Sequence, residues 1–396
     1  MSKINELVQT LCPDGVEYKI LPMISVNCDR QRKAITSGKR IAGSTPYYGA
    51  SGIVDYVEGY IFEGVYLLVS EDGANLLARS TPIAFSISGK TWVNNHAHVL
   101  KFENDVTRKF VEYFFNSIDL SPYITGGAQP KLNQDNLNSI EIPVPPLPVQ
   151  EEIVRILDEY TELEAELEAK LSEEIELKQR QYEFYRACLF NVKNADILKI
   201  GDFTQVFSAS RVHKSDWKSE GVRFWRSSDL MSYFNGVENP RGKVFISYEL
   251  YEKLSAKSGK IRKYDILITG GGSIGVPYLV PDDEPLYVKD ADLLCIQRND
   301  RVDSEYLYFY FLTSEFRDYL KDITHDATIA HYTISQIKET PVPVPSMTEQ
   351  RKIVKALKEL KTEMDAIIST LNTELESRKK QYAYYRDQLL TFKRKE

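Results

Sequence analysis

A repeat with a period of 200 residues constrains the fold of this chain more than any other feature of the sequence. Residues 143–154 read PVPPLPVQEEIV and residues 343–354 read PVPSMTEQRKIV, so that prolines, valines, a glutamine and an isoleucine recur at matching positions. The register holds to the end of each segment, where QYEFYRACL at 181–189 returns as QYAYYRDQL at 381–389. Solenoid repeats have periods of roughly 20 to 50 residues. This longer period therefore indicates the duplication of a whole domain together with a helix.

Each copy of the repeated phrase leads into a stretch of about 40 residues without glycine or proline. Proline is tolerated at the first turn of a helix and excluded from its interior, so both stretches are predicted to be long helices that begin at the prolines. Ser346 and Glu349 add the spacing of a capping box to the second start. At about 1.5 Å per residue, each helix would be roughly 60 Å long.

Apolar residues mark one stripe along each predicted helix. In the second helix their spacing alternates between four and three, the pattern of a heptad seam, and the first helix repeats it with Glu164 at one position. A small globular domain cannot cover a stripe of this length, so each helix is expected to need a partner helix. The predicted seam residues are Ile153, Leu157, Tyr160, Leu167 and Leu171 in the first helix and Ile353, Leu357, Leu360, Met364, Ile367 and Leu371 in the second.

The two predicted helices carry opposite charges. Residues 151–180 contain eleven acidic and four basic side chains, a net charge of −7, whereas residues 351–380 contain five acidic and eight basic side chains, a net charge of +3. Opposite charges favour pairing of the two different helices over pairing of like with like. We therefore expect an antiparallel pair within one chain, with 153–171 packed against 353–371 and a globular domain at each end of the rod. Two independent surface helices, or helices that dimerise between chains, are the alternatives.

The chain is expected to contain two globular domains of mixed α/β fold. Its 396 residues, 42% hydrophobic and 11% aromatic, suffice for two cores of ordinary domain size. Short β-rich runs and buried aromatic helices recur in both halves, whereas the interiors differ, which suggests two related readers of different targets. An amphipathic helix is expected at 2–12, where the end of the second long helix could meet it. The repeat sets the boundaries: a first domain with this short helix at 1–148, a long helix at 149–192, a second domain at 193–346 and a second long helix at 347–396.

Composition excludes several classes of protein. No apolar run approaches the roughly 18–20 residues that span a membrane, and residues 1–7 lack the apolar core of a signal peptide. The cysteines Cys12, Cys28, Cys188 and Cys295 are scattered, which fits reduced thiols in the cytoplasm better than a disulfide framework or a zinc site. The net charge of −7 argues against a protein that coats nucleic acid, but much of the acid lies in the first helix, so DNA binding is not excluded.

Two local motifs have ordinary explanations. Residues 270–275 read GGGSIG, but the chain continues as VPYLVP and not as a helix that could hold phosphates, so a turn between strands is expected. His96 and His98 would face the same side of a predicted strand, but no further Cys, His or acidic cluster joins them in the sequence. We therefore expect packing or hydrogen bonding there, no metal site and no cofactor.

The sequence contains no recognisable set of catalytic residues. It has no base-methylation motif of the Asn/Asp-Pro-Pro-Tyr/Phe type, no Walker loop, no nucleophile elbow and no nuclease-like cluster of acids with a lysine. Such a chain is expected to act in recognition or assembly and not as an enzyme.

Basic side chains gather in loop-like stretches of both predicted domains. A local excess of this kind can neutralise phosphates, and arginine and lysine can also pair with guanine edges. Solvated surface charge is the alternative, but basic stretches in both domains favour DNA. The predicted DNA-binding residues are Arg30, Arg32, Lys33, Lys39, Arg40, Arg211, Lys214, Lys218, Arg223, Arg226, Arg241 and Lys243.

These segments together resemble the specificity (S) subunit of type I restriction–modification systems, over nearly the whole length of the chain. The most telling parts are the PVPPLPVQEEIV phrase, its copy 200 residues on and the QYxxYR helix ends. YGASGIVDY at 48–56, NNHAH at 94–98 and DILIT at 265–269 also look like segments of this family.

The resemblance implies two target-recognition domains separated by an antiparallel two-helix coiled coil, each domain reading one half of a bipartite site in double-stranded DNA. It also implies that the helix pair sets the spacing of the half-sites and docks two modification (methyltransferase) subunits, which restriction (motor–nuclease) subunits join. S-adenosylmethionine, ATP and Mg²⁺ would then belong to those partners. The other interpretations are a specificity module of a different methyltransferase–nuclease complex and a non-catalytic coiled-coil adaptor.

Overall fold

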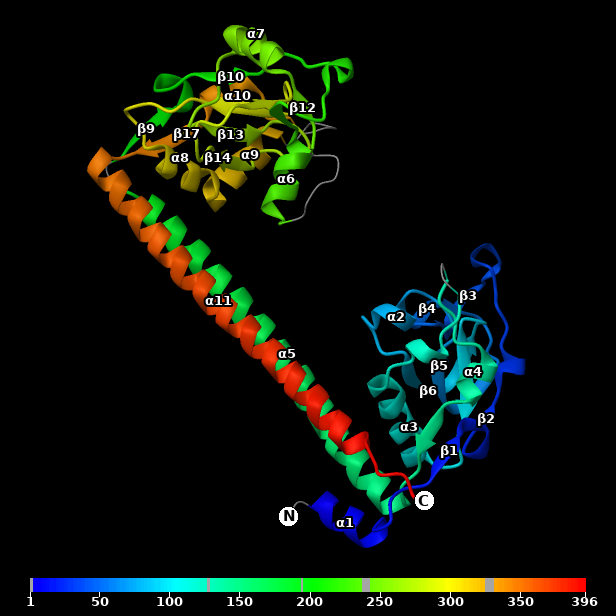
Figure 1. Ribbon diagram of the computed structural model, residues 1–396. Coiled ribbons are helices and arrows are strands. Elements are labelled where there is room, and N and C mark those ends of the chain that lie inside the picture. The colour runs from blue at the N-terminus through cyan, green and yellow to red at the C-terminus, as the bar shows by residue number, and fades with distance from the viewer. Residues whose placement is uncertain (1–2, 127–128, 194, 237–242, 325–330) are drawn as a thin grey trace. The chain divides into compact units, whose positions relative to one another are not determined.

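The computed structural model describes residues 3–126, 129–193, 195–236, 243–324 and 331–396. The chain divides into two compact units: unit 1 consists of Met1–Leu171 and Asn372–Glu396, and unit 2 consists of Ser172–Leu371. Each unit has a globular part of strands and short helices and contains parts of two long helices, α5 (Leu147–Phe190) and α11 (Met347–Leu390) (Figure 1).

A six-stranded sheet forms the centre of the globular part of unit 1. Its strands lie in the order β2-β7-β5-β6-β3-β4, and every neighbouring pair is antiparallel except β3 and β6. The central strand β5 is buried from Tyr66 to Ser70, which fits its continuous apolar run. The strands are β2 (Val26–Asn27), β3 (Ala42–Gly49), β4 (Gly52–Val57), β5 (Phe62–Ser70), β6 (Ala84–Val93) and β7 (Ala97–Lys101).

Short helices of unit 1 share one apolar core with this sheet and with α5. Asn104 caps α3 by accepting hydrogen bonds from two backbone N–H groups of its first turn. The buried face of α3, which includes Phe110 and Phe115, shares a core with Leu67 of β5 and Leu157 of α5. The globular part is therefore packed directly on the first long helix. The helices are α1 (Lys3–Leu11), α2 (Asn75–Ala78), α3 (Asp105–Ser117) and α4 (Gln134–Asn138).

Unit 2 contains two smaller sheets in place of the six-stranded one. A four-stranded antiparallel sheet has the order β10-β16-β13-β14, and a three-stranded mixed sheet has the order β12-β11-β15. The strands are β10 (Val206–Ser208), β11 (Val222–Trp225), β12 (Phe245–Ile246), β13 (Ile266–Thr269), β14 (Pro277–Leu279), β15 (Leu286–Val288) and β16 (Leu293–Ile296). The helices of its globular part are α6 (Ser227–Phe234), α7 (Tyr248–Ser258), α8 (Ser304–Phe311), α9 (Ser314–Thr324) and α10 (Ile334–Glu339).

The two units share a frame but not an interior, as the sequence repeat predicted. In unit 1, β1 (Tyr18–Ile20) pairs antiparallel with β8 (Glu141–Pro143) just before α5 begins. In unit 2, β9 (Asp196–Lys199) pairs in the same way with β17 (Pro341–Val344) just before α11. An aromatic helix, α3 or α8, contributes buried rings to the core of each unit. The predicted mixed α/β fold of both units is confirmed.

The two long helices pack against each other within unit 1. Each has 44 residues, which corresponds to about 66 Å. The ring of Tyr160 in α5 lies 6.3 Å from that of Tyr382 and 6.4 Å from that of Tyr385 in α11, and Lys379 Nζ lies 2.7 Å from Glu168 Oε1. Residue numbers rise along α5 as they fall along α11. The predicted antiparallel pairing within one chain is therefore confirmed.

The register of the pair differs from our expectation. We expected 153–171 to pack against 353–371, but in unit 1 residues of this part of α5 contact the last part of α11, which begins at Asn372. The stretch 353–371 lies in unit 2, where Ile353 and Leu357 share a core with Phe190 at the end of α5. The reason is geometric: when two antiparallel helices of equal length overlap fully, the first half of each faces the second half of the other.

The predicted seam residues differ in how deeply they are buried. Tyr160 remains 40% exposed. Ile153, Leu157, Leu171, Ile353 and Leu357 are buried, and Leu167, Leu360, Met364, Ile367 and Leu371 are half-buried.

No helix among the described ranges is long and apolar enough to cross a membrane. In the two long helices, charged residues flank the apolar stripe throughout.

The glutamine repeated at 150 and 350 fixes the start of each long helix. Gln150 Nε2 donates to Pro145 O at 2.7 Å, and Gln350 Nε2 donates to Pro345 O at 2.8 Å. Gln350 Oε1 also accepts from the backbone N–H of Asp303, which caps α8. Each glutamine thus folds back on the proline-rich phrase and fixes the angle at which the chain enters the helix.

The expected N-terminal helix is present as α1. Its Ile4 is buried in the core that also contains Ile153 of α5 and Leu390 of α11. Lys3 Nζ lies 2.7 Å from Glu152 Oε2. The end of α11 therefore meets the N-terminal helix, as the sequence suggested.

The two local motifs have different outcomes. GGGSIG connects β13 to β14, which pair antiparallel, so the predicted turn between strands is confirmed. His96 and His98 do not face the same side, contrary to our expectation: His96 is exposed and His98 is buried. The reason is that β7 begins only at Ala97, so His96 belongs to the turn before the strand.

Candidate nucleic-acid interface

The basic loop of unit 1, residues 29–40, is fastened to the sheet at several points. It contains two 3₁₀ turns, η2 (Asp29–Gln31) and η3 (Ser37–Lys39). Trp92 Nε1 donates to Lys33 O at 2.7 Å, and the backbone N–H of Ile35 donates to the hydroxyl of Tyr47 at 2.9 Å. The loop therefore follows a defined path across β6 and β3.

Arg32 points into the protein, although we predicted it to bind DNA. Its guanidinium lies 2.5 Å from Glu71 Oε2, 2.8 Å from Ala97 O and 3.3 Å from Asp29 Oδ2. Only 14% of its side chain is exposed. Lys131 extends the cluster, with its Nζ 3.0 Å from Glu71 Oε1. The guanidinium is thus engaged by the protein itself.

His98 joins the same cluster through both ring nitrogens. Nδ1 lies 2.6 Å from Asp29 Oδ2, and Nε2 lies 2.8 Å from Leu132 O. Both partners are acceptors, so a doubly protonated ring satisfies both contacts, whereas a neutral ring has only one N–H to donate. His98 is 1% exposed, so both of these contacts are buried.

The carboxylates of the cluster are held ionised despite their burial. Burial opposes ionisation of Asp29, but the hydrogen bond and charge of His98, the backbone N–H of Val99 and the charge of Arg32 together lower the pKa of Asp29 below its ordinary value. Burial also opposes ionisation of Glu71, and hydrogen bonds from Arg32 and Lys131 lower its pKa in turn. The cluster is therefore a set of buried charges that compensate one another.

The same side chains could in principle bind a metal ion. Asp29, Glu71 and His98 offer three ligand atoms within 4.8 Å of one another. The guanidinium of Arg32 already lies beside both carboxylates, however, and His98 Nε2 is committed to a carbonyl. A divalent ion would sit next to a fixed positive charge and be repelled by it. We therefore interpret the cluster as an ion network and not as a metal site.

Arg40, at the far end of the basic loop, is also engaged by the protein. Its Nη1 lies 3.0 Å from Asp55 Oδ2, its Nε donates to Ile35 O at 3.0 Å, and its guanidinium carbon lies 4.5 Å from the centre of the Tyr47 ring. The hydrogen bond from Arg40 lowers the pKa of Asp55. Arg40 therefore ties the loop to β3 and β4.

The other predicted residues of the basic loop face solvent. Arg30, Lys33 and Lys39 are exposed, and they form no ion pair or side-chain hydrogen bond with any residue that the structure describes. Their charges are available to a ligand such as a DNA phosphate.

In unit 2, as in unit 1, some of the predicted DNA-binding residues are engaged by the protein itself and others are exposed. Arg226 Nε and Nη2 lie 2.8 and 3.0 Å from the two oxygens of Asp229, and its guanidinium lies 5.8 Å from the centre of the Trp217 ring. Asp229 is buried, so Arg226 fastens the start of α6 to the end of β11. The exposed members, which lack an ion-pair partner within the described ranges, are Arg211, Lys214, Lys218 and Arg223. Lys243 is exposed as well, and Arg241 lies outside the described residues.

The pattern of charged residues in the sequence did not reveal the cluster that holds the basic loop. Glu71 and His98 lie 39 or more residues from Arg32 and Asp29 in the sequence and reach them only through the pairing of β5 and β7. One signal was present: Asp29 is the lone acid beside five bases in the loop. Sequence reasoning also missed the exposed apolar side chains of edge strand β4, namely Ile53, Val54 and Tyr56.

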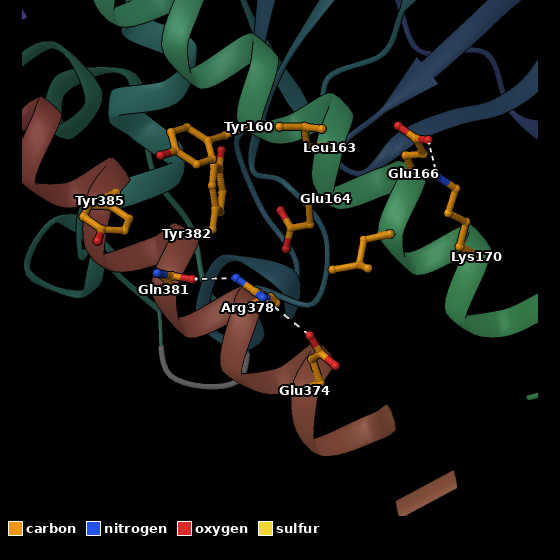
Figure 2. Close-up of a pocket in the computed structure, with 11 residues that line it drawn as sticks. Tyr160, Leu163, Glu164, Glu166, Lys170, Glu374, Arg378, Gln381, Tyr382 and Tyr385 are labelled. Carbon is orange, nitrogen blue, oxygen red and sulfur yellow. Dashed lines mark hydrogen bonds and ion pairs between the residues drawn. The ribbon is translucent and has the colours of Figure 1, made fainter. Parts of the chain in front are cut away.

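A second candidate surface is a groove between α5 and α11 in unit 1, with a volume of about 500 Å³. Figure 2 shows the rings of Tyr160, Tyr382 and Tyr385 close together at one end and Glu164 pointing into the space between the helices. Leu163, on its rim, is 61% exposed. Partial burial and the nearby charge of Glu168 raise the pKa of Glu164. The groove is thus an open apolar surface with an acid at its centre.

Comparison with known proteins identifies the family. Residues 23–177 and 192–377 each match the model of the type I restriction modification DNA specificity domain. The chain belongs to this family. Both matches include a globular part and most of the long helix that follows it, which agrees with the 200-residue repeat.

Relatives of this specificity-subunit family match most of the chain. A protein of Haemophilus influenzae, provisionally named a type I restriction enzyme specificity subunit, is 33% identical over 383 residues, which cover 95% of this chain and 96% of that protein. The EcoR124I/EcoR124II specificity subunit of Escherichia coli is 25% identical over 308 residues, which cover 74% of this chain and 73% of that protein.

Solved structures support the fold. A chain from a structure concerning complex assembly and conformational transition of the type I restriction–modification system has a TM-score of 0.69 at 15% identity, covering 96% of this chain and 98% of that one. The HsdS subunit of Thermoanaerobacter tengcongensis has a TM-score of 0.54 at 14% identity, covering 96% and 97%. At these identities the likeness concerns the fold alone.

Proposed function

We propose that this chain recognises DNA for a type I restriction–modification enzyme, and that each globular part reads one half of a bipartite site in double-stranded DNA. The observation that carries this function is the match of both copies of the repeat to the DNA specificity domain. The role of this chain is recognition, while methyl transfer and cleavage belong to other subunits. S-adenosylmethionine, ATP and Mg²⁺ would be bound by those subunits.

The duplicated frame supports two readers of different sequences. In this proposal, residues 1–148 and 193–346 are the two target-recognition domains, and residues 149–192 and 347–396 are the helices between them. The shared frame (β1 with β8, β9 with β17) gives each reader the same attachment to a long helix, whereas the different sheets of the two interiors suit different base sequences. The exposed basic residues of each interior supply contacts to phosphates and to base edges.

We further propose that the groove in unit 1 is where one methyltransferase subunit docks, and that a second copy docks on unit 2. Interfaces are built around apolar and aromatic side chains with a polar rim. The groove has this composition: Tyr160, Leu163 and Tyr385 are exposed around Glu164. Two docked methyltransferases would bring one active site to each half of the DNA site, and the restriction subunits would join that assembly.

A pair of matched variants tests the docking surface. Leu163→Glu places a charge on the rim of the groove, and we expect it to abolish or strongly reduce co-purification of the chain with its methyltransferase subunit, since burial of an unpaired charge is unfavourable. Ala165→Glu adds the same charge two residues along α5, where the residue is exposed and does not line the groove, and we expect it to leave co-purification intact. Equal effects of the two variants would contradict docking in the groove.

The function itself is tested with purified components. The chain alone should neither methylate nor cleave DNA, and the complex with its methyltransferase subunit should bind one duplex in the presence of excess non-specific competitor. An adaptor protein would not confer such binding, and methylation by the isolated chain would contradict the recognition role. The identity of the co-purifying enzymes separates a type I system from another methyltransferase–nuclease complex.

We place the chain in the cytoplasm, with the DNA that it reads.

A further inference from the structure

We propose that Arg32 and Arg40 are positioning residues that hold the basic loop in its DNA-reading conformation, and that the DNA contacts of this loop come from Arg30, Lys33 and Lys39. The inference rests on the DNA-reading function proposed above. It divides one cluster of cations in the sequence into two anchors and three contacting residues.

The near anchor leaves Arg32 little capacity to bind DNA. Four contacts use its guanidinium: Nε donates to Asp29 O at 3.2 Å, Nη1 lies 2.5 Å from Glu71 Oε2 and 2.8 Å from Ala97 O, and Nη2 lies 3.3 Å from Asp29 Oδ2. An arginine has five N–H groups, and a bidentate contact to guanine needs two of them. Arg32 therefore cannot bind a base without giving up its contacts with two buried carboxylates, which is unfavourable.

Asp29 extends this anchor from the loop to the centre of the sheet. Its Oδ1 accepts from the backbone N–H of Val99 at 2.7 Å, and its Oδ2 accepts from His98 Nδ1 at 2.6 Å. Val99 and His98 lie in β7, next to the central strand β5. Arg30 directly follows Asp29 in the chain, so this network also fixes the backbone of one of the proposed contacting residues.

The far anchor holds the loop at its other end. Arg40 reaches Asp55 in β4 and Ile35 O within the loop, and its guanidinium lies over the ring of Tyr47. The hydroxyl of Tyr47, which is buried, accepts from the backbone N–H of Ile35. The stretch between Ile35 and Arg40 is therefore presented as a turn with both ends fixed, and Lys39 lies within it.

The positioning role predicts a change in DNA affinity opposite to the one expected from the removal of a negative charge alone. Removal of an acid from a DNA-facing surface should strengthen binding, because DNA is an anion. Asp55→Asn instead frees Arg40 and loosens the loop, so we expect weaker binding of the cognate duplex by the complex with the methyltransferase subunit, by about tenfold. Glu58→Gln is the matched control: Glu58 is exposed, lies three residues further on and forms no ion pair with any described residue. We expect this control to leave binding unchanged or slightly stronger.

A double-mutant cycle completes the test. We expect Arg40→Gln to weaken binding about as much as Asp55→Asn, and the double variant to be no weaker than either single variant, since both break one anchor. The salt dependence of binding should stay the same for all three. In contrast, Lys39→Ala should reduce the slope of log K against log salt by about 0.9, the value for one phosphate contact.

The outcomes are distinct. If Asp55→Asn leaves binding unchanged or stronger, as expected for Glu58→Gln, and Arg40→Gln lowers the salt slope, then Arg40 itself contacts DNA and the positioning role is wrong. If the wild-type complex shows no sequence preference, it is the proposed function that fails. Asp29→Asn, nearly isosteric, tests the buried anchor: we expect weaker cognate binding with co-purification of the methyltransferase retained. If this variant does not fold, the Arg40 cycle still decides the question.

Discussion

At the scale of single residues, the sequence shows where charge lies but not what it does. Arg30 and Arg32 stand two positions apart in one basic stretch, yet the first is exposed and the second is embedded among Asp29, Glu71 and Ala97. The difference depends on which strands lie under the loop, and that pairing joins residues dozens of positions apart. A basic stretch therefore predicted the region of the candidate site, and only the fold separates its members.

Glu152 provides a residue-scale prediction about pH. Its side chain is 5% exposed, and hydrogen bonds from Arg155 and then Lys3 lower its pKa from 4.5 to about 2. Because the pKa in the folded chain is below that in the unfolded chain, the stabilisation is present above about pH 4.5 and is lost as pH falls toward 2. We expect Glu152→Gln to lower the thermal midpoint near neutral pH, with a gap to wild type that narrows below about pH 4.5.

The control for this prediction is Glu159→Gln. Glu159 also pairs with Arg155, but 60% of its side chain is exposed, so solvent screens the pair. We expect little change in the thermal midpoint at any pH. A gap between Glu152→Gln and wild type that stays constant from neutral pH to pH 3 would show that the lowered pKa does not stabilise the fold.

At the scale of elements, the long helices were the most predictable part of the chain. The proline-rich phrases placed both helix starts within two residues, because the rules for proline concern the local backbone, whereas the second helix ends at Leu390 and not at 396. In α5 the predicted heptad spacing continues only to about Leu171. The next buried or half-buried positions are Ile175, Lys178 and Tyr182, so two steps of four residues follow each other where the heptad pattern would have a four and then a three. Such an insertion locally unwinds a coiled coil. The pairing register was wrong because a stripe shows which face is apolar and not where the partner begins.

The helix pair gives an element-scale prediction with two leucines of α5. Leu157 is fully buried in the core of unit 1, so Leu157→Ala should lower the free energy of unfolding by about 2–5 kcal/mol. Leu163 is 61% exposed, and Leu163→Ala should change it by less than about 0.5 kcal/mol. Urea unfolding followed by circular dichroism measures both. Similar losses for the two leucines would mean that the groove is packed more tightly than the structure shows.

At the scale of the whole molecule, the repeat predicted two units with a common frame, but it could not predict their interiors. The frame recurs because its residues recur, as Gln150 and Gln350 illustrate by folding back on their own proline phrases. The six-stranded sheet of unit 1 and the two smaller sheets of unit 2 follow from sequences that have diverged. Strand order depends on contacts between distant segments, which local patterns do not specify.

If the helix pair sets the gap between the two half-sites, lengthening it should widen the gap. One heptad added after Leu171 and another after Leu371 keeps the helices in phase and adds roughly 10 Å, or about 3 base pairs. It also turns one reader about 100° around the duplex, so we expect lower activity from steric mismatch, while any surviving site keeps both half-sequences. An unchanged gap in a folded, active variant would contradict this role, and a heptad in one helix alone should mainly damage folding.

The central claim, two readers for one bipartite site, is tested most directly by mapping methylated bases in a host that carries this chain and its methyltransferase subunit. The account predicts methylation at one bipartite sequence that disappears when the chain is deleted. With Arg30 and Lys33 both changed to alanine, it predicts relaxation of one half-sequence only, while Arg211→Ala with Arg223→Ala affects the other. Methylation that persists without the chain, or relaxation of both half-sequences by the first pair of changes alone, would contradict it.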